Sequence, residues 1–114
     1  MPEPDFSIKR GDTASPIYAT LEDSTGAAVD ISSASIIFRL GPVGGGTLVV
    51  DDFANNDQVD DGSDGSLGQV SYQWDTALTE PGLFVAEWEV TYASGSVETF
   101  PNGGYNLVLV TPDL

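Results

Sequence analysis

Hydrophobic and polar residues alternate with a period of two along most of this chain, which is the pattern of β-strands that bury one face. The clearest run covers residues 83–92. One face of this run is apolar and carries Phe84, Ala86, Trp88, Val90 and Tyr92. The other face carries Glu87, Glu89 and Thr91. We therefore expect the face with Trp88 to belong to the core.

Turn-forming residues recur about every ten residues, so the strands are predicted to be short and numerous. The predicted strands are residues 5–10, 17–23, 35–40, 47–51, 69–74, 83–92, 97–100 and 105–110. Helices are predicted to be scarce or absent. Inward apolar stripes recur on several strands, with Arg39 facing outward, and they predict two facing sheets.

Four connections between these strands have distinct compositions. Residues 75–82 end in Pro-Gly, which suits a type II turn, and we expect them to cross from one sheet to the other. Residues 93–95, Ala-Ser-Gly, predict a hairpin. Residues 53–68 are rich in Asn, Asp, Gly and Ser and predict a mobile surface loop. Three glycines at 44–46 predict a second flexible tip.

Charge restricts the partners that this chain can bind. Eighteen acidic residues against Lys9, Arg10 and Arg39 give a net charge of −15. Phosphate backbones and anionic lipids would repel such a chain, so we expect no nucleic-acid and no membrane partner. No apolar stretch approaches the ~18 residues of a membrane span. We attribute the acidity to solubility and to protection of sheet edges, with docking onto a basic partner or adaptation to high salt as alternatives.

The chain contains neither histidine nor cysteine, which excludes disulfides, the usual catalytic triads and cysteine dyads. The best remaining acid–base candidates are Glu87 and Glu89. Their spacing on one strand face is roughly 6–7 Å at the backbone, near the carboxylate separation of inverting glycosidases. Alternating polar residues on a solvent face have the same spacing, so we interpret the pair as solvent-facing. We predict no enzymatic activity and no cofactor.

A cluster of aspartates is the candidate metal site. It contains Asp57, Asp60, Asp61 and Asp64, and calcium binds several oxygen ligands of this kind. The spacing departs from the calcium-loop pattern, because Val59 and Gly68 occupy ligand positions. We therefore predict a solvated acidic loop without a metal. A weak divalent cation site and a contact with a basic neighbour are the alternatives.

Arg10, Gly11 and Asp12 spell a tripeptide that some adhesion ligands use to bind integrins. They directly follow a predicted strand that contains Phe6 and Ile8. A turn in which the aspartate bonds its own backbone explains them, and we favour this interpretation.

Trp74 and Trp88 could stack on a sugar ring if they were exposed. Both lie on the apolar side of their strands, so we predict that they are packed in the core.

Several short motifs follow one another from Phe6 to about Val110. They are Arg10-Gly-Asp-Thr13, the Gly26 turn into Val29-Asp-Ile31, Gly68-Gln-Val-Ser-Tyr-Gln-Trp74, Glu87-Trp-Glu-Val90 and Thr99-Phe-Pro101. In this order they resemble the small immunoglobulin-like domain of tailed bacteriophages that is named after the N-terminal domain of the baseplate upper protein. The resemblance implies an all-β, immunoglobulin-like antiparallel β-sandwich of about 7–8 strands. It also implies a single domain over residues 1–114, with a core over 6–110 and extended termini.

The resemblance further implies a non-enzymatic structural protein of a tailed-phage virion, assembled in the host cytoplasm. We expect an accessory component of the tail or baseplate, with a head decoration protein as the alternative. The expected partners are other virion proteins, with self-association as a further option. The loops and the termini at Pro2–Pro4 and Thr111–Pro112 are expected to contact them. A host-surface or carbohydrate-binding module is the alternative from another class, and it would require exposed aromatic residues.

Overall fold

The computed structural model describes residues 4–56, 68–75, 77–101 and 106–112. Within these ranges the chain forms eight strands and no helix, so no described segment could cross a membrane as a helix. The strands are β1 (Phe6–Lys9), β2 (Ile17–Thr20), β3 (Ser35–Pro42), β4 (Val50–Asn56), β5 (Gln69–Tyr72), β6 (Gly82–Thr91), β7 (Val97–Phe100) and β8 (Asn106–Thr111). The all-β prediction and the predicted number of strands are confirmed.

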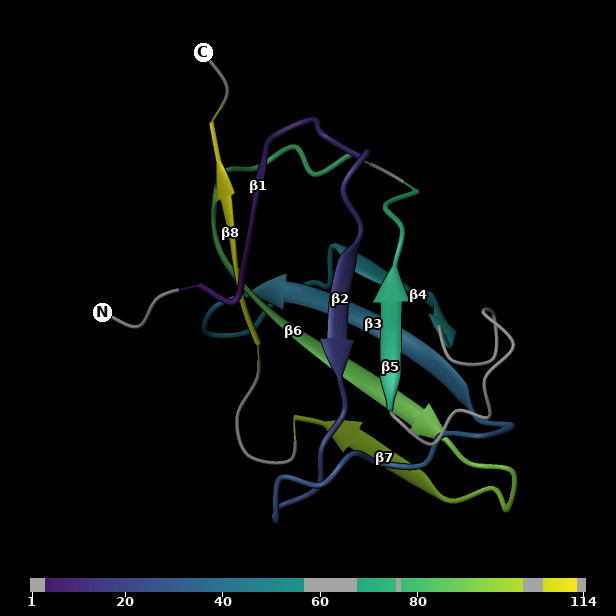
Figure 1. Ribbon diagram of the computed structural model, residues 1–114. Helices are drawn as coiled ribbons and strands as arrows, with labels where there is room; N and C mark the ends of the chain where they lie inside the picture. The colour runs from purple at the N-terminus through teal and green to yellow at the C-terminus, as the bar shows by residue number, and fades with distance from the viewer. Residues whose placement is uncertain (1–3, 57–67, 76, 102–105, 113–114) are drawn as a thin grey trace.

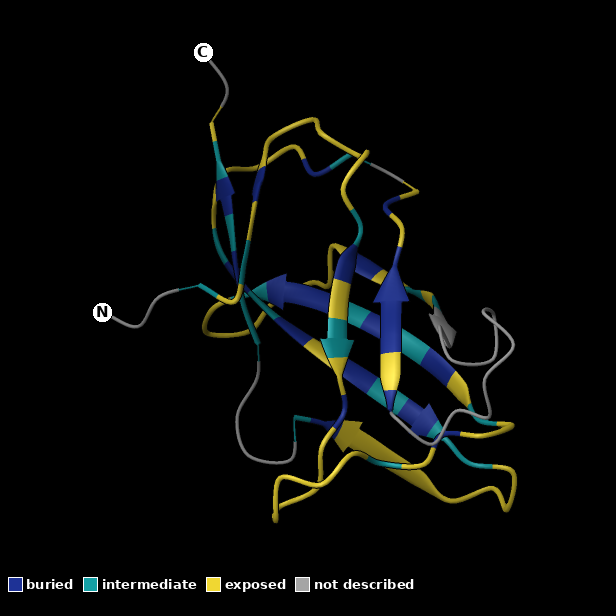
Figure 2. Ribbon diagram, viewed as in Figure 1, coloured by how far each residue is buried: buried dark blue, intermediate teal, exposed yellow. Residues whose placement is uncertain are grey.

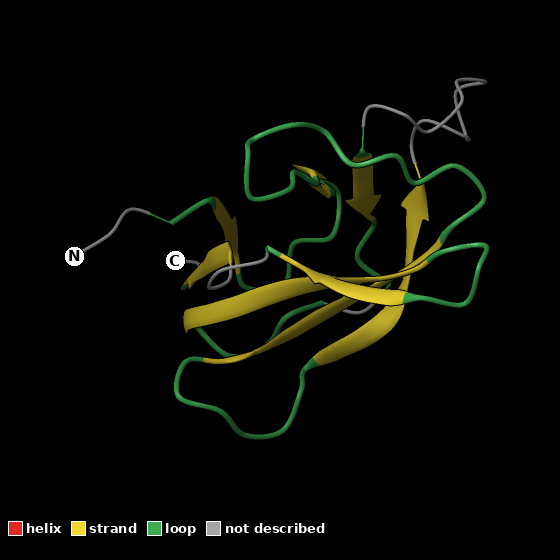
Figure 3. Ribbon diagram, turned by 90° about the horizontal axis from the view of Figure 1, so that it is seen from below, coloured by secondary structure: helices red, strands yellow, loops and turns green. Residues whose placement is uncertain are grey.

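The strands hydrogen-bond in the order β1-β8-β6-β3-β4-β5-β2, and β7 also pairs with β6 (Figure 1). Strand β4 connects two parts of this order, because its residues 50–54 pair with β3 and its residues 55–56 pair with β5. Strands β2 and β5 consequently lie across the long strands β3 and β6 (Figure 1). Seen from below, the long strands form one layer and short strands stand apart from it (Figure 3).

One strand pair differs from the predicted antiparallel arrangement. Strand β1 runs parallel to β8, with Phe6 opposite Val108 and Ile8 opposite Val110. Parallel neighbours need a long connection, and here almost the whole chain lies between the two strands. The two ends of the described chain therefore lie side by side and run in the same direction.

The central pair of strands, β3 and β6, confirms the predicted faces. Phe38 lies opposite Trp88, and both side chains are fully buried. On the opposite face, Arg39 lies opposite Glu87. Figure 2 shows the resulting alternation of buried and more exposed positions along the strands.

The core is centred on the ring of Phe38, which contacts aromatic residues from both layers. Its centroid lies 4.7 Å from that of Trp88, 4.8 Å from that of Tyr72 and 5.8 Å from that of Trp74. The indole nitrogen of Trp74 donates a hydrogen bond to the carbonyl oxygen of Ser15 at 2.9 Å. These contacts join β3 and β6 to the segment that contains β5.

Two predictions about the region of strand β4 are wrong. The strand covers Val50–Asn56 rather than 47–51, and its last four residues fall in the stretch that was predicted to be a surface loop. Aspartate and asparagine have low strand propensity, which explains the wrong prediction. Pairing with β3 on one side and β5 on the other outweighs that propensity.

Two predicted connections are confirmed. The chain crosses between the layers after β5, as predicted, because β5 pairs with β2 and the end of β4, whereas β6 pairs with β3 and β8. The type II turn stays a prediction. The hairpin after β6 is closed by a hydrogen bond from the Gly95 backbone N–H to the Tyr92 carbonyl oxygen at 2.9 Å. Residues 57–67 of the predicted loop lie outside the described residues, as does Tyr105, the first residue of the predicted last strand.

Candidate functional site

The paired carboxylates of β6 lie on the face that points away from the core. Glu87 is exposed, whereas the side chain of Glu89 is 25% exposed and accepts a hydrogen bond from Arg39 Nη1 at 2.8 Å. Arg39 Nε also donates to Asp51 at 3.1 Å. Hydrogen bonds with Glu89 and Asp51 raise the pKa of Arg39, so the guanidinium stays charged. Glu89 is therefore partly buried and engaged in an ion pair, so the structure agrees with the solvent-facing interpretation for Glu87 and only in part for Glu89.

The aspartates of the candidate metal loop, Asp57, Asp60, Asp61 and Asp64, lie outside the described residues, so the prediction of a solvated acidic loop stays a prediction. Within the described part of the chain, no three acidic side chains are grouped so that they could hold a metal ion. Asp52, which precedes this loop, accepts a hydrogen bond from the backbone N–H of Phe53 at 2.8 Å. Burial, and next the negative charge of Asp52, raise the pKa of Tyr72.

The Arg10-Gly11-Asp12 tripeptide forms a turn after β1, as predicted, but the turn is closed by main-chain groups and not by the predicted bond from the aspartate side chain. The backbone N–H of Asp12 donates to the carbonyl oxygen of Lys9 at 3.1 Å, so the main chain closes the turn. The N–H of Arg10 donates to the carbonyl oxygen of Thr111, and that of Gly11 to the carbonyl oxygen of Leu78. The tripeptide thus connects β1 to β8 and to the segment before β6, which is a structural role.

The two tryptophans are buried, as predicted. Trp74 is 4% exposed and Trp88 is 0% exposed, so neither offers a ring face to a sugar. The exposed aromatic residues of the described chain are Tyr18 on β2, at 69%, and Phe53 on β4, at 72%. They lie on different strands.

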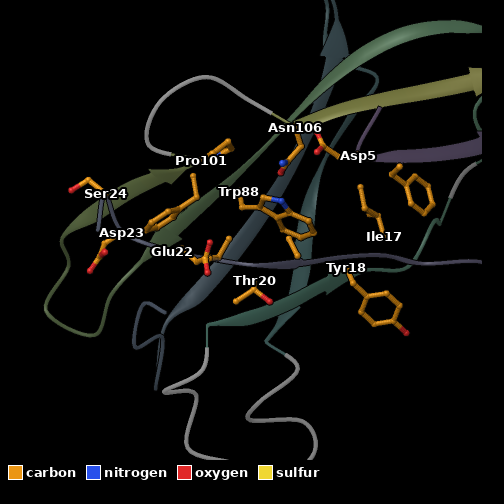
Figure 4. A pocket seen from close by; sticks show the side chains of 14 residues that line it. Asp5, Ile17, Tyr18, Thr20, Glu22, Asp23, Ser24, Trp88, Pro101 and Asn106 are labelled. Atoms are coloured by element: carbon orange, nitrogen blue, oxygen red, sulfur yellow. The ribbon is translucent and has the colours of Figure 1, made fainter. Parts of the chain in front are cut away.

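A groove of about 530 Å³ lies along β2 and was not predicted from the sequence. One wall is formed by eight consecutive residues, Ile17–Ser24, and the opposite wall includes Asp5, Trp88 and Asn106 (Figure 4). Phe100 also lines the groove. Successive residues of a strand point to opposite faces. A groove that is lined by consecutive residues of β2 must therefore follow the edge of the strand.

This edge of β2 carries backbone groups that its neighbour β5 does not use. The N–H of Leu21 donates to the carbonyl oxygen of Gly68 at 2.8 Å, in the same register as the β2–β5 pairing. Groups that face the partner strand alternate with groups that face away in an antiparallel pair. Ile17 and Ala19 consequently face β5, whereas the N–H and C=O groups of Tyr18 and Thr20 face the groove. Among the described strands, β2 pairs with β5 alone.

The indole of Trp88 forms part of the opposite wall of the groove. Its Nε1 is buried and has no hydrogen-bond partner among the described residues. In Figure 4 this nitrogen lies on the side of the ring that is turned toward Asn106 and Asp5. A buried N–H without an acceptor is uncommon, because it loses its bond to water without a replacement.

The charged residues that line the groove are all acidic, namely Asp5, Glu22 and Asp23. Asp5 accepts a hydrogen bond from the backbone N–H of Leu107 at 2.7 Å. Hydrogen bonds from Thr25 and Ala27 lower the pKa of Asp23, so it remains ionised at neutral pH. The groove therefore combines negative charge, unused backbone groups and an apolar wall.

The sequence carries no local signal for this groove. Its walls come from β1, β2, β6, β7 and β8, and Ile17 and Trp88 are far apart along the chain. The unused edge follows from the position of β2 at the end of the strand order, which depends on the complete sheet topology.

Comparisons of this chain with family models, with curated proteins and with solved structures found no match. Its function is therefore inferred from its own residues and their geometry.

Proposed function

We propose that this chain is a non-enzymatic structural protein of a tailed-bacteriophage virion, an accessory component of the tail or baseplate. In this proposal its two layers form an immunoglobulin-like β-sandwich. Its partners are other virion proteins. The proposal rests first on the sequence motifs that resemble the phage domain, and next on where their residues lie.

The order of the strands supports the immunoglobulin-like assignment. Immunoglobulin-like sandwiches place the second and fifth strands in one sheet and the third, sixth and last strands in the other. Here β2 pairs with β5, while β3, β6 and β8 are neighbours in the other layer. Several features depart from antibody domains. The chain has no cysteine, and the residue at the centre of β3 is Phe38 rather than tryptophan. In addition, β1 pairs with β8, and β4 pairs with strands of both layers.

The observation that best supports the proposal is that the motif residues occupy turns and buried core positions. Gly11 lies in the turn that joins β1 to its neighbours, and Gly68 lies where the chain passes the backbone of Leu21. Trp88 and Phe100 are buried in the core. Residues with such roles suit a domain that serves as a building block.

A carbohydrate-binding module is less well supported. Such a module would display aromatic rings around a concave face, and both tryptophans are in the core. Tyr18 borders the groove along β2, but Phe53 points away from the core on β4, so the two exposed rings form no common platform.

The copy number of the protein in purified virions tests the proposal. Quantitative mass spectrometry would compare it with the major capsid protein of the same particles. A number small enough for one ring, or for a stack of tail rings, is the expected result. Near-parity with the capsid protein, or a simple fraction of its number, would instead identify a head decoration protein. Absence from the particle would overturn the structural role.

A further inference from the structure

We propose that the groove along β2 is a docking site for an extended, basic segment of a partner protein, which adds as a strand beside Tyr18 and Thr20. This inference rests on the groove itself and does not require the partner to be a virion protein. Its three supports are the backbone of β2, the apolar wall and the charge.

The backbone of β2 offers the hydrogen bonds. Tyr18 and Thr20 each turn one N–H and one C=O group toward the groove, and β5 occupies the opposite edge of the strand. Free strand edges pair readily with extended chains, and sheet proteins use this mode to bind peptides. The groove extends along all of β2 and continues past it to Ser24. It therefore has the form that an additional strand requires.

Apolar residues on both sides give the groove a surface for side chains. Partly buried Phe6 and Ala19 line it, beside the buried residues Ile17, Trp88 and Phe100. Side chains on one face of an added strand would pack against this surface, and those on the other face would point to solvent. An acceptor entering beside Trp88 would also give its unpaired indole N–H a partner. We therefore expect alternating apolar residues in the partner segment.

The negative charge of the groove favours a positively charged partner segment. Asp5, Glu22 and Asp23 line the groove, and none of the described residues that line it is a lysine or arginine. A second copy of this chain is disfavoured, because the edge-to-edge pairing of two β2 strands would bring two acidic grooves together on molecules of net charge −15. A segment with lysine or arginine between its apolar residues would be attracted.

The first test uses a capped peptide of alternating lysine and valine, about six residues long, which is the usual length of a strand. A peptide of alternating glutamate and valine is the matched control. Both are titrated into the full ¹⁵N-labelled chain while amide chemical shifts are recorded. The lysine peptide is expected to shift the amides of Tyr18 and Thr20 and the indole N–H of Trp88, and the glutamate peptide is not. Equal binding of both peptides, or shifts that leave Tyr18 and Thr20 unmoved, would overturn the proposal.

The second test removes one of the backbone hydrogen-bond donors that β2 turns toward the groove. Thr20→Pro deletes an N–H that faces the groove and is not used by β5, so it is expected to weaken binding of the lysine peptide about tenfold or more. Unchanged affinity in a folded Thr20→Pro chain would overturn the proposal.

Because this variant could also affect folding, two further peptides test the same point on the unaltered chain. One is N-methylated at every lysine and the other at every valine. Backbone N–H groups of alternate residues point to opposite edges of a strand, so one peptide is expected to lose binding while the other keeps it. Any other result would exclude strand addition.

Discussion

Arg39 Nη1 donates to Glu89 Oε2 at 2.8 Å, joining the two central strands β3 and β6 on the face that points away from the core. The guanidinium also bonds Asp51 on β4, so one side chain connects three neighbouring strands. The three residues lie at positions 39, 51 and 89, and the strand register brings them together.

Arg39→Met is expected to lower the free energy of unfolding by about 1 kcal/mol or less, because the three side chains are partly exposed. The loss should shrink as salt is added, since salt screens exposed ion pairs. Urea denaturation at low and high salt measures both effects. Lys9→Met removes the same charge from an exposed position on β1 and is the control. An equal loss in both variants would mean that net charge is responsible, and not the ion pair.

Trp88→Ala is expected to lower the free energy of unfolding by about 3–5 kcal/mol, because it empties a fully buried site. Trp88→Phe should cost less, since it keeps an aromatic ring and removes the unpaired indole N–H. Chemical denaturation measures both. Tyr18→Ala, at a position 69% exposed, is the control and should cost about 1 kcal/mol or less. A Trp88→Ala chain as stable as the Tyr18→Ala chain would contradict the placement of this residue.

Tyr92 should make stability depend on alkaline pH. Burial, together with the hydrogen bond from its hydroxyl to Glu98 at 2.8 Å, raises the pKa of Tyr92 to about 12. The unfolded chain has a tyrosine pKa near 10. Between these values the folded chain holds the proton more tightly, so the free energy of unfolding should fall as the pH rises.

In Tyr92→Phe this fall should be shallower, although Tyr72, whose pKa is also raised, still contributes. Denaturation in guanidinium chloride across the same pH range measures the slope. Glu98→Gln keeps a hydrogen-bond acceptor and removes the charge, so it should lower the pKa of Tyr92, as recorded by tyrosinate absorbance. If the free energy of unfolding of Tyr92→Phe falls with pH as steeply as that of the unaltered chain, this assignment is wrong.

Gly68→Ala is expected to be more destabilising than Gly26→Ala. Both glycines have a left-handed backbone, with φ of +65° and +85°, which costs other residues about 1–2 kcal/mol. A Cβ atom at Gly68 would also lie 2.6 Å from the carbonyl oxygen of Leu21, whereas one at Gly26 would have no neighbour within 4 Å. Urea denaturation of the two variants measures the difference. Equal losses would contradict the close approach of the chain at Gly68.

The sequence alone predicted features that depend on neighbouring positions along a strand. Alternation placed Phe38, Trp74 and Trp88 in the core and Arg39 on the outer face, and the structure agrees. The hairpin after β6 was also predictable, because a tight turn is determined by its own few residues. Such features are local, and the cost of misplacing a large apolar side chain is high enough to determine them.

The tertiary structure decided features that depend on which distant strands become neighbours. Strand β4 extends to Asn56 against the propensity of its residues, because β3 and β5 supply hydrogen bonds on its two sides. Strand β1 pairs with β8 in the parallel direction, and these two strands come from opposite ends of the chain. The groove along β2 exists because β2 comes last in the strand order and its edge faces Trp88. Nearly all residue types offer the same backbone hydrogen-bonding groups. The side-chain pattern of one strand therefore does not identify the strand with which it pairs.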